Sequence, residues 1–312
     1  MQLYKSRTFG DYFSDTFTFL KENGKHFYKN YFIINGILII ILLVMMFFFS
    51  RFYTNVIFSD TFGDGGNSLT NYLDQNLGVL AIFGFLFVII ALLLGIVNYA
   101  YTPLYFLLYE KNKGSNFSKN DIVDALKSNL GKIFTFLLAG ILIAIPLFMA
   151  LGLIIVILTI TIIGIPLLLI AVAWLSQFYY IAFITYLQTN KGVFECFSYG
   201  FNLSFKNFWA ANGCVALFYI MIQVVQGIVT LIPYSFAMGS LVLGAEEASN
   251  MNTTDQSMTI ITMLTAVYMV AFFVNIILTT ILQMNQSIIF FSLKEDIENI
   301  NTKSEIDEIG SY

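Results

Sequence analysis

Long apolar runs separated by short polar connectors form the main pattern along the chain. The runs without a charged residue cover residues 31–49, 78–108, 133–187, 208–243 and 258–291. A helix rises about 1.5 Å per residue, so about 20 apolar residues cross the hydrocarbon core of a bilayer. Each run therefore predicts at least one membrane-spanning helix.

The third run is too long for one crossing. As a single helix, residues 133–187 would measure roughly 80 Å against a hydrocarbon core of about 30 Å. The segment "TITIIGIP", residues 159–166, combines β-branched residues with Gly164 and Pro166, which favour a tight connection. The pattern therefore predicts two spans in this run and six in the chain.

The positive charges agree with six spans. Of the 15 Lys and Arg residues, only Arg51 lies in the connectors that follow the first, third and fifth spans. Because Lys and Arg favour cytoplasmic connectors, six spans place both termini in the cytoplasm, whereas five would put Lys-bearing connectors on both sides. The opposite connectors carry acidic residues instead: Asp60, Asp64, Asp74, Glu246, Glu247 and Asp255.

The composition also indicates a lipid environment. The chain is 58% hydrophobic and 11% charged, with a mean hydropathy of +0.79, against about 45–50% apolar and 25% charged residues in soluble domains. In water such a chain would leave large apolar areas exposed. A pI near 5.0 and the lack of a basic stripe argue against a nucleic-acid partner.

An amphipathic stretch precedes each pair of spans, with apolar residues at helical steps of three or four. These residues are Phe9, Phe13, Phe17 and Leu20, then Ile122, Leu126 and Leu130, then Phe194, Phe197, Phe201, Phe205 and Phe208. A short sequence motif is also repeated: "LKENGKHF" (20–27) resembles "LKSNLGKIF" (126–134) and, more loosely, "LSFKNFW" (203–209). We predict an all-α polytopic membrane protein with six transmembrane helices in three hairpins, each preceded by a cytoplasmic interfacial amphipathic helix.

The repeat predicts a single six-span membrane domain over residues 1–292, with units of about 9–110, 118–190 and 193–292. An acidic cytoplasmic tail, residues 293–312, follows. Its short, charged composition favours a solvated tail, and docking of a cytoplasmic partner through its isoleucines is the alternative.

Basic and aromatic residues flank the predicted spans on the cytoplasmic side. Lys21, Lys25 and Lys29 step by four and share one helix face, from which they reach lipid headgroups. The predicted membrane-interface anchors are Lys21, Lys25, Lys29, Lys127, Lys132, Lys206 and Trp209.

No Asp, Glu, Lys or Arg lies near the centre of a predicted span, so the usual groups of proton-coupled transport are missing there. The spans carry amides instead, and these favour interhelical hydrogen bonds, with a polar cavity or subunit interface as the alternative. The candidates are Asn98, Gln177, Gln223, Gln226, Asn275 and Gln283.

The sequence offers no residues in a catalytic or metal-binding pattern. His26 is the only histidine, and Cys196 and Cys214 have no ligand spacing. The GxSxG motif of a serine nucleophile is absent. We therefore predict no cofactor, no metal and no catalytic residue.

The segment "TIIGIPLLLIAVAWLSQFYYIAFITYLQTNKGVFECFSYGFNLSFKNFWAANG" resembles the membrane domain associated with glycerophosphodiester phosphodiesterases, and related uncharacterised bacterial multi-pass families. The resemblance is clearest over residues 160–215. It rests on a Gly-Pro span, a polar connector and a short helix ending in Ser204, Lys206, Phe208 and Trp209. The motifs are architectural, and no segment is long and polar enough for the soluble phosphodiesterase barrel. Some relatives carry a beta-carotene monooxygenase label, but such oxygenases bind iron through several histidines.

The resemblance implies a bacterial inner-membrane protein found with other membrane subunits and a MoxR-type AAA+ ATPase system. Together with the uncharged spans, this predicts a non-enzymatic structural or scaffolding subunit of a multi-subunit membrane complex. The alternative is a transporter or flippase for an apolar or lipid substrate, with Asn98, Gln177, Gln223 and Asn275 lining its cavity. A membrane enzyme is the third possibility.

Overall fold

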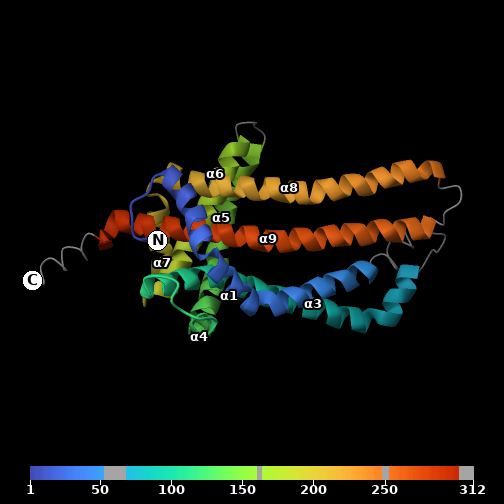
Figure 1. The fold of residues 1–312 in the computed structure, drawn as a ribbon, viewed down its shortest axis with the longest axis horizontal. Helices are drawn as coiled ribbons and strands as arrows, with labels where there is room; N and C mark the ends of the chain where they lie inside the picture. The colour runs from blue at the N-terminus through green and yellow to red at the C-terminus, as the bar shows by residue number, and fades with distance from the viewer. Residues whose placement is uncertain (53–67, 160–163, 248–252, 302–312) are drawn as a thin grey trace, which may run out of the picture. The chain divides into compact units, whose positions relative to one another are not determined.

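The computed structural model describes residues 1–52, 68–159, 164–247 and 253–301, and every regular element within those ranges is a helix (Figure 1). In chain order the helices are α1 (Phe9–Phe52), α3 (Ser68–Lys111), α4 (Lys119–Ser128), α5 (Leu130–Thr159), α6 (Gly164–Gln188), α7 (Val193–Ser204), α8 (Phe208–Glu247) and α9 (Thr253–Glu298). Six of them, α1, α3, α5, α6, α8 and α9, are long and apolar enough to cross a membrane. The predicted all-α class and the six spanning helices are confirmed. Asp60, Asp64 and the tail from residue 302 lie outside the described residues.

The long third run forms two helices, as predicted. Helix α5 ends at Thr159 and α6 begins at Gly164. Pro166 is the third residue of α6, within the first turn, where a missing backbone N–H removes no intrahelical hydrogen bond.

The three amphipathic stretches fold in two different ways. The second and third form the separate helices α4 and α7, but the first is the beginning of α1, which continues unbroken to Phe52. A single glycine, Gly24, costs a helix only about 1 kcal/mol and does not end it. By contrast, Asn129 separates α4 from α5, and Asn207, at φ 45°, lies between α7 and α8.

The chain divides into two compact units. Unit 1 comprises Met1–Ile34, Val97–Met221 and Thr279–Tyr312, and unit 2 comprises Asn35–Ile96 and Ile222–Leu278. The boundaries between them fall within α1, α3, α8 and α9. The sequence-based prediction of one domain with three repeat units stays a prediction.

Aromatic side chains make up the core of unit 1. Phe19 of α1 stacks on Phe106 of α3 with ring centroids 4.5 Å apart, and Phe27 meets the edge of Tyr105 at 4.8 Å. Such pairs stabilise by about 0.5–1.5 kcal/mol beyond the area they bury. The Tyr101 hydroxyl also donates to the backbone oxygen of Phe27 at 2.8 Å. Rings and phenol hydroxyls therefore join α1 to the end of α3.

The buried face of α1 is not its phenylalanine stripe. Phe9 and Phe17 are exposed, and Phe13 and Leu20 are half-buried. The fully buried large side chains of α1 are instead Tyr12, Phe19, Phe27 and Tyr31.

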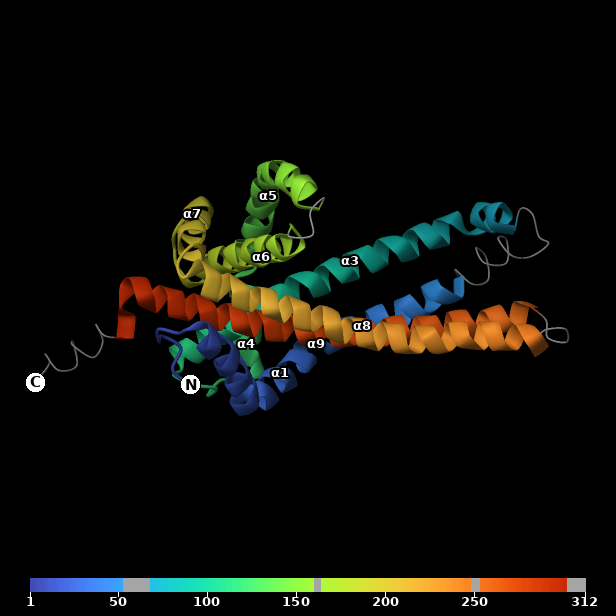
Figure 2. The same ribbon diagram turned by 90° about the horizontal axis from the view of Figure 1, so that it is seen from above.

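Helices α6 and α7 of unit 1 lie side by side (Figure 1 and Figure 2). A Cβ atom on Gly200 of α7 would lie 2.9 Å from the backbone nitrogen of Ala182 in α6, so only glycine permits this approach. While one side of α7 is buried in this way, Phe194, Phe201 and Phe205 remain 61%, 43% and 50% exposed.

Unit 2 carries an apolar surface. Ile39, Leu42 and Met45 of α1 are buried, whereas Phe85 of α3 and Leu231 of α8 are largely exposed. Large exposed apolar side chains on spanning helices fit lipid surroundings, since lipid tails are as apolar as leucine.

Candidate functional site

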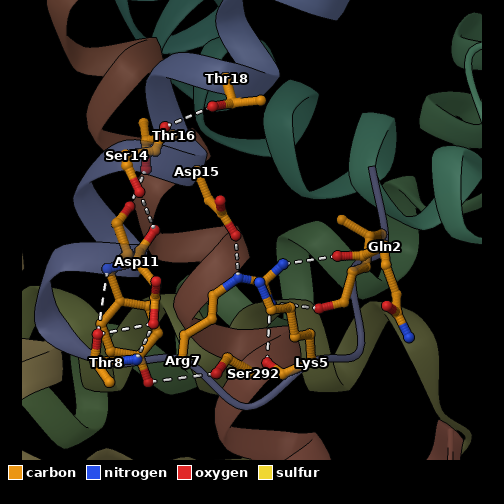
Figure 3. Close-up of polar contacts among 12 residues, drawn as sticks. Gln2, Lys5, Arg7, Thr8, Asp11, Ser14, Asp15, Thr16, Thr18 and Ser292 are labelled. Atoms are coloured by element: carbon orange, nitrogen blue, oxygen red, sulfur yellow. Dashed lines mark hydrogen bonds and ion pairs between the residues drawn. The ribbon is translucent and has the colours of Figure 1, made fainter.

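Arg7 holds the first residues of the chain against α1 (Figure 3). Its buried guanidinium donates from Nε to Asp15 Oδ2 at 2.8 Å and from Nη1 and Nη2 to the backbone oxygens of Leu3 and Gln2, both at 2.7 Å. A further bond reaches the backbone oxygen of Lys5 at 3.1 Å. The planar guanidinium presents five donors in a fixed fork, so one side chain fixes both the loop and its attachment to the helix.

Thr8 starts α1 directly after this loop. Its backbone N–H and its hydroxyl both donate to Asp11 Oδ2, at 2.9 and 2.7 Å. Threonine is a favoured residue at a helix start, and an acidic residue three positions later completes the cap. The segment "RTFGD" therefore fixes where α1 begins.

A polar network joins this N-terminal segment to the ends of three helices. The Tyr4 hydroxyl donates to Glu110 Oε1 of α3 at 2.7 Å, and Gln188 Nε2 of α6 donates to Glu110 Oε2 at 3.1 Å. Lys294 Nζ of α9 donates to Gln188 Oε1 at 2.7 Å and lies 3.9 Å from Glu298 Oε2. The chain of contacts therefore runs from Tyr4 to α9 without interruption.

Two tyrosines in this network stay protonated. Burial, followed by the hydrogen bond to Glu110, raises the pKa of Tyr4 well above its usual range. Burial and the bond to Glu298 raise the pKa of Tyr199, whose hydroxyl donates to Glu298 Oε1 at 2.8 Å. Both phenols therefore act as donors to carboxylates throughout the physiological pH range.

Amides form a second set of contacts inside unit 1. Asn285 of α9 donates to Thr16 Oγ1 at 3.0 Å and to the backbone oxygen of Tyr12 at 3.2 Å. Gln177 donates to the backbone oxygen of Gln286 at 3.3 Å, and Gln286 Nε2 donates to Ser176 Oγ at 2.8 Å. These bonds join α9 to α1 and α6.

The predicted amides have different surroundings. Asn98 accepts a bond from the Tyr31 hydroxyl at 2.8 Å in unit 1, where Gln177 and Gln283 are buried. In unit 2, Gln226 donates to the backbone oxygen of Ala271 at 3.1 Å, whereas Gln223 and Asn275 are exposed.

Most predicted anchors are exposed, but Lys132 is not a simple surface lysine. Its Nζ donates to the backbone oxygens of Tyr186 and Thr189, at 3.2 and 2.7 Å, near the carboxyl end of α6. A cation is favourable there because of the helix dipole. The exposed anchors are Lys21, Lys25, Lys29, Lys127, Lys206 and Trp209.

His26 joins two segments of unit 1. Its Nδ1 lies 2.8 Å from the Tyr105 hydroxyl, and its Nε2 lies 2.9 Å from the backbone oxygen of Phe117. In the part of the chain that the structure describes, no three His, Cys, Asp or Glu side chains form a group that could hold a metal ion. The absence of a cofactor stays a prediction.

Each unit contains an apolar cavity. The cavity of unit 1 has a volume of about 520 Å³ and lies among α3, α5 and α6. That of unit 2 has a volume of about 500 Å³, among α1, α3 and α9, with Phe83, Phe87 and Tyr268 in its walls. Both volumes fall in the range of small-molecule sites, about 300–1,000 Å³. None of the six predicted amides lines either cavity.

Sequence reasoning did not identify Arg7, Tyr4, Glu110 or Lys294 as a connected set. The only local indication in the sequence is that Arg7 and Asp15, of opposite charge, lie on either side of the start of α1. The other contacts join residues far apart in the chain, such as Tyr4 and Glu110.

The fold and these contacts define a polytopic α-helical membrane protein whose helices are linked through buried aromatic and amide side chains. Comparisons with family models, curated proteins and solved structures found no match to this chain.

Proposed function

We propose that the protein is a non-enzymatic subunit that scaffolds a multi-subunit complex in the bacterial inner membrane, with both termini in the cytoplasm. The observation that carries the proposal is an exposed phenylalanine row, formed by Phe194 and Phe201 of α7 and by Phe205 directly after it. Trp209, in the first turn of α8, is 68% exposed. Helix α7 is not among the six candidate spans, so its row is not explained by a membrane crossing. Large aromatic side chains in an exposed patch are typical of protein contact sites.

The amide contacts support the same proposal. Asn285, Gln286 and Gln226 bond to neighbouring helices, as expected for structural links. We infer that the polar side chains stabilise the bundle and that the α7 row binds another membrane subunit.

Affinity purification in mild detergent, followed by mass spectrometry, tests the proposal. We expect membrane subunits to co-purify, and we expect the triple variant Phe194→Ala, Phe201→Ala, Phe205→Ala to recover them at least about fivefold less. The matched control replaces three exposed phenylalanines on spanning helices, Phe47, Phe85 and Phe134, with alanine. Recovery of a lone monomer, or equal loss in both triple variants, would contradict a scaffold that uses α7.

The resemblance adds a partner to this proposal, a MoxR-type AAA+ ATPase system bound through the acidic tail. Deletion of residues 302–312 is expected to remove the ATPase from the purified complex while the membrane subunits remain. An ATPase that still co-purifies after the deletion would refute the role of the tail.

The cavity of unit 2 favours the second candidate, a transporter or flippase for an apolar or lipid substrate. Gly84 lies in its wall, and a Cβ atom there would meet no other atom within 4 Å, so we expect Gly84→Leu to place its side chain in the cavity. Lipid flipping in reconstituted vesicles by the wild-type protein, and its loss in Gly84→Leu, would support transport through this cavity. No flipping by the wild-type protein would refute it.

A further inference from the structure

The cavity of unit 1 is a groove lined chiefly by residues of α5 and α6. Small residues on α5, Gly140 and Ala144, alternate with the larger Phe136 and Phe148 along its length. The Tyr179 hydroxyl of α6 donates to the backbone oxygen of Gly140 at 3.0 Å. This bond holds the tyrosine ring against α5 and fixes one wall of the groove.

The surroundings of the groove are apolar. Helices α5 and α6 are both candidate membrane spans. Leu138, Ile141 and Ile145 of α5 are 66%, 60% and 56% exposed. Exposed leucine and isoleucine on a spanning helix face hydrocarbon, so the groove opens to lipid chains.

The length of the groove matches one leaflet. Residues 136–148 cover about 18 Å of helix axis at 1.5 Å per residue. The hydrocarbon core is about 30 Å thick, and one leaflet is half of it. One acyl chain that enters from the membrane surface therefore spans the groove.

A cation lies at one end of the groove. Lys132 precedes Phe136 by four residues, one helical turn or about 6 Å along α5. Two of its N–H groups donate to Tyr186 and Thr189, and an ammonium has three. The half-buried Lys132 thus keeps a donor and a positive charge where the headgroup of a lipid in the groove would lie.

We propose that this groove is a binding site for one anionic phospholipid, with an acyl chain along Gly140 and Ala144 and its phosphate at Lys132. Apolar walls select the chain, and the cation selects the negative headgroup. The site does not depend on the scaffold role.

Photo-crosslinking in nanodiscs tests the position of the acyl chain. A phosphatidylglycerol probe with a diazirine in its acyl chain is expected to label α5 and α6 peptides of the wild-type protein. Ala144→Phe, which fills the groove, should reduce this labelling at least fivefold, and the smaller Ala144→Leu should reduce it less. Leu142→Phe is the matched control, since Leu142 is 62% exposed and does not line the groove.

Uniform labelling of all spanning helices, or unchanged labelling in both Ala144 variants, would overturn the site. Thermal unfolding shows whether each variant folds. If Ala144→Phe does not fold, the labelling of Ala144→Leu tests the site. Purification of the wild-type protein without partner subunits, while the groove is still labelled as expected, would count against the scaffold role alone.

A phosphatidylcholine probe with the same chain tests the headgroup. We expect the wild-type protein to be labelled at least threefold more by the anionic probe. Lys132→Gln should remove this preference, while Lys132→Arg and the exposed-site control Lys127→Gln should keep it. Equal labelling by the two probes in the wild-type protein would overturn the role of Lys132.

Discussion

Arg7 is the side chain on which the position of the N-terminal segment depends. It is buried, its partner Asp15 is only partly exposed, and it satisfies backbone oxygens of Gln2, Leu3 and Lys5. A buried guanidinium that makes four hydrogen bonds costs more to remove than a surface charge, because its acceptors are left without partners.

We predict that Arg7→Met destabilises the protein by about 2–4 kcal/mol. Unfolding by denaturing detergent, compared with the wild-type protein, measures the change. Lys5→Met is the matched control, since the Lys5 side chain is exposed, and it should change stability by less than about 0.5 kcal/mol. Equal losses in the two variants would show that the Arg7 contacts do not hold the segment.

The spacing of the lysines predicted membrane-interface anchors, but it did not predict the contacts that each basic residue makes. Lys21, Lys25 and Lys29 are exposed on α1, as a four-residue step on one face predicts. Lys132 has the same residue type and a similar position before a span, yet it donates to Tyr186 and Thr189. That contact forms because the carboxyl end of α6 packs beside the start of α5. The local sequence does not predict which residues of two neighbouring helices will meet.

The contact between α6 and α7 depends on one glycine. We predict that Gly200→Ala destabilises the protein by about 1–3 kcal/mol and Gly200→Val by more, because the added Cβ meets the backbone of Ala182. Thermal unfolding in detergent measures both variants. Gly131→Ala in α5 is the control, since nothing lies near its Cβ position, and alanine should be neutral or stabilise by up to about 1 kcal/mol. A stable Gly200→Val protein would refute close packing of α7.

The start of α4 depends on an ionised carboxylate. Asp121 accepts bonds from the backbone N–H of Ser118 at 2.7 Å and from its hydroxyl at 2.8 Å. These bonds hold the pKa of Asp121 below its ordinary value of 3.8 in the folded protein. Because the folded pKa is the lower one, the stabilisation is complete above the ordinary value and is lost as pH falls through the folded value.

We therefore predict that Asp121→Asn speeds hydrogen exchange of the first α4 amides at neutral pH. The difference from the wild-type protein should vanish at a pH well below 3.8. Asp124→Asn, an exposed change in the same helix, is the control and should have no such effect. A difference that persists in acid would show that the charge of Asp121 is not its cause.

Helix starts were only partly predictable. The steps of Ile122 and Leu126 indicated α4, and both side chains are buried. The same kind of pattern at Phe9 and Phe13 predicted a separate helix, but α1 is continuous. Between residues 20 and 31 the chain has no proline and no residue in a left-handed conformation, so the helix continues into the span.

The whole chain is expected to insert with both termini in the cytoplasm. We predict that changing Lys21, Lys25 and Lys29 together to Glu reduces correct insertion by at least about threefold, since these lysines are exposed near the first span. Green fluorescent protein and alkaline phosphatase fused after Tyr312 report the side on which the C-terminus lies. The charge-preserving change of all three to Arg should leave the fluorescence intact. Phosphatase activity of the wild-type fusion would place the C-terminus on the opposite side.

The sequence by itself determined the all-α class and the number of spans, because a span requires only a local run of apolar residues long enough to cross the bilayer. Tertiary structure alone decided which faces are inside. A soluble helix marks its buried face by hydrophobicity, but lipid is as apolar as a protein core. The apolar stripe at Phe9 and Phe17 is therefore exposed, while Tyr12 and Phe27 are buried by partners from distant parts of the chain.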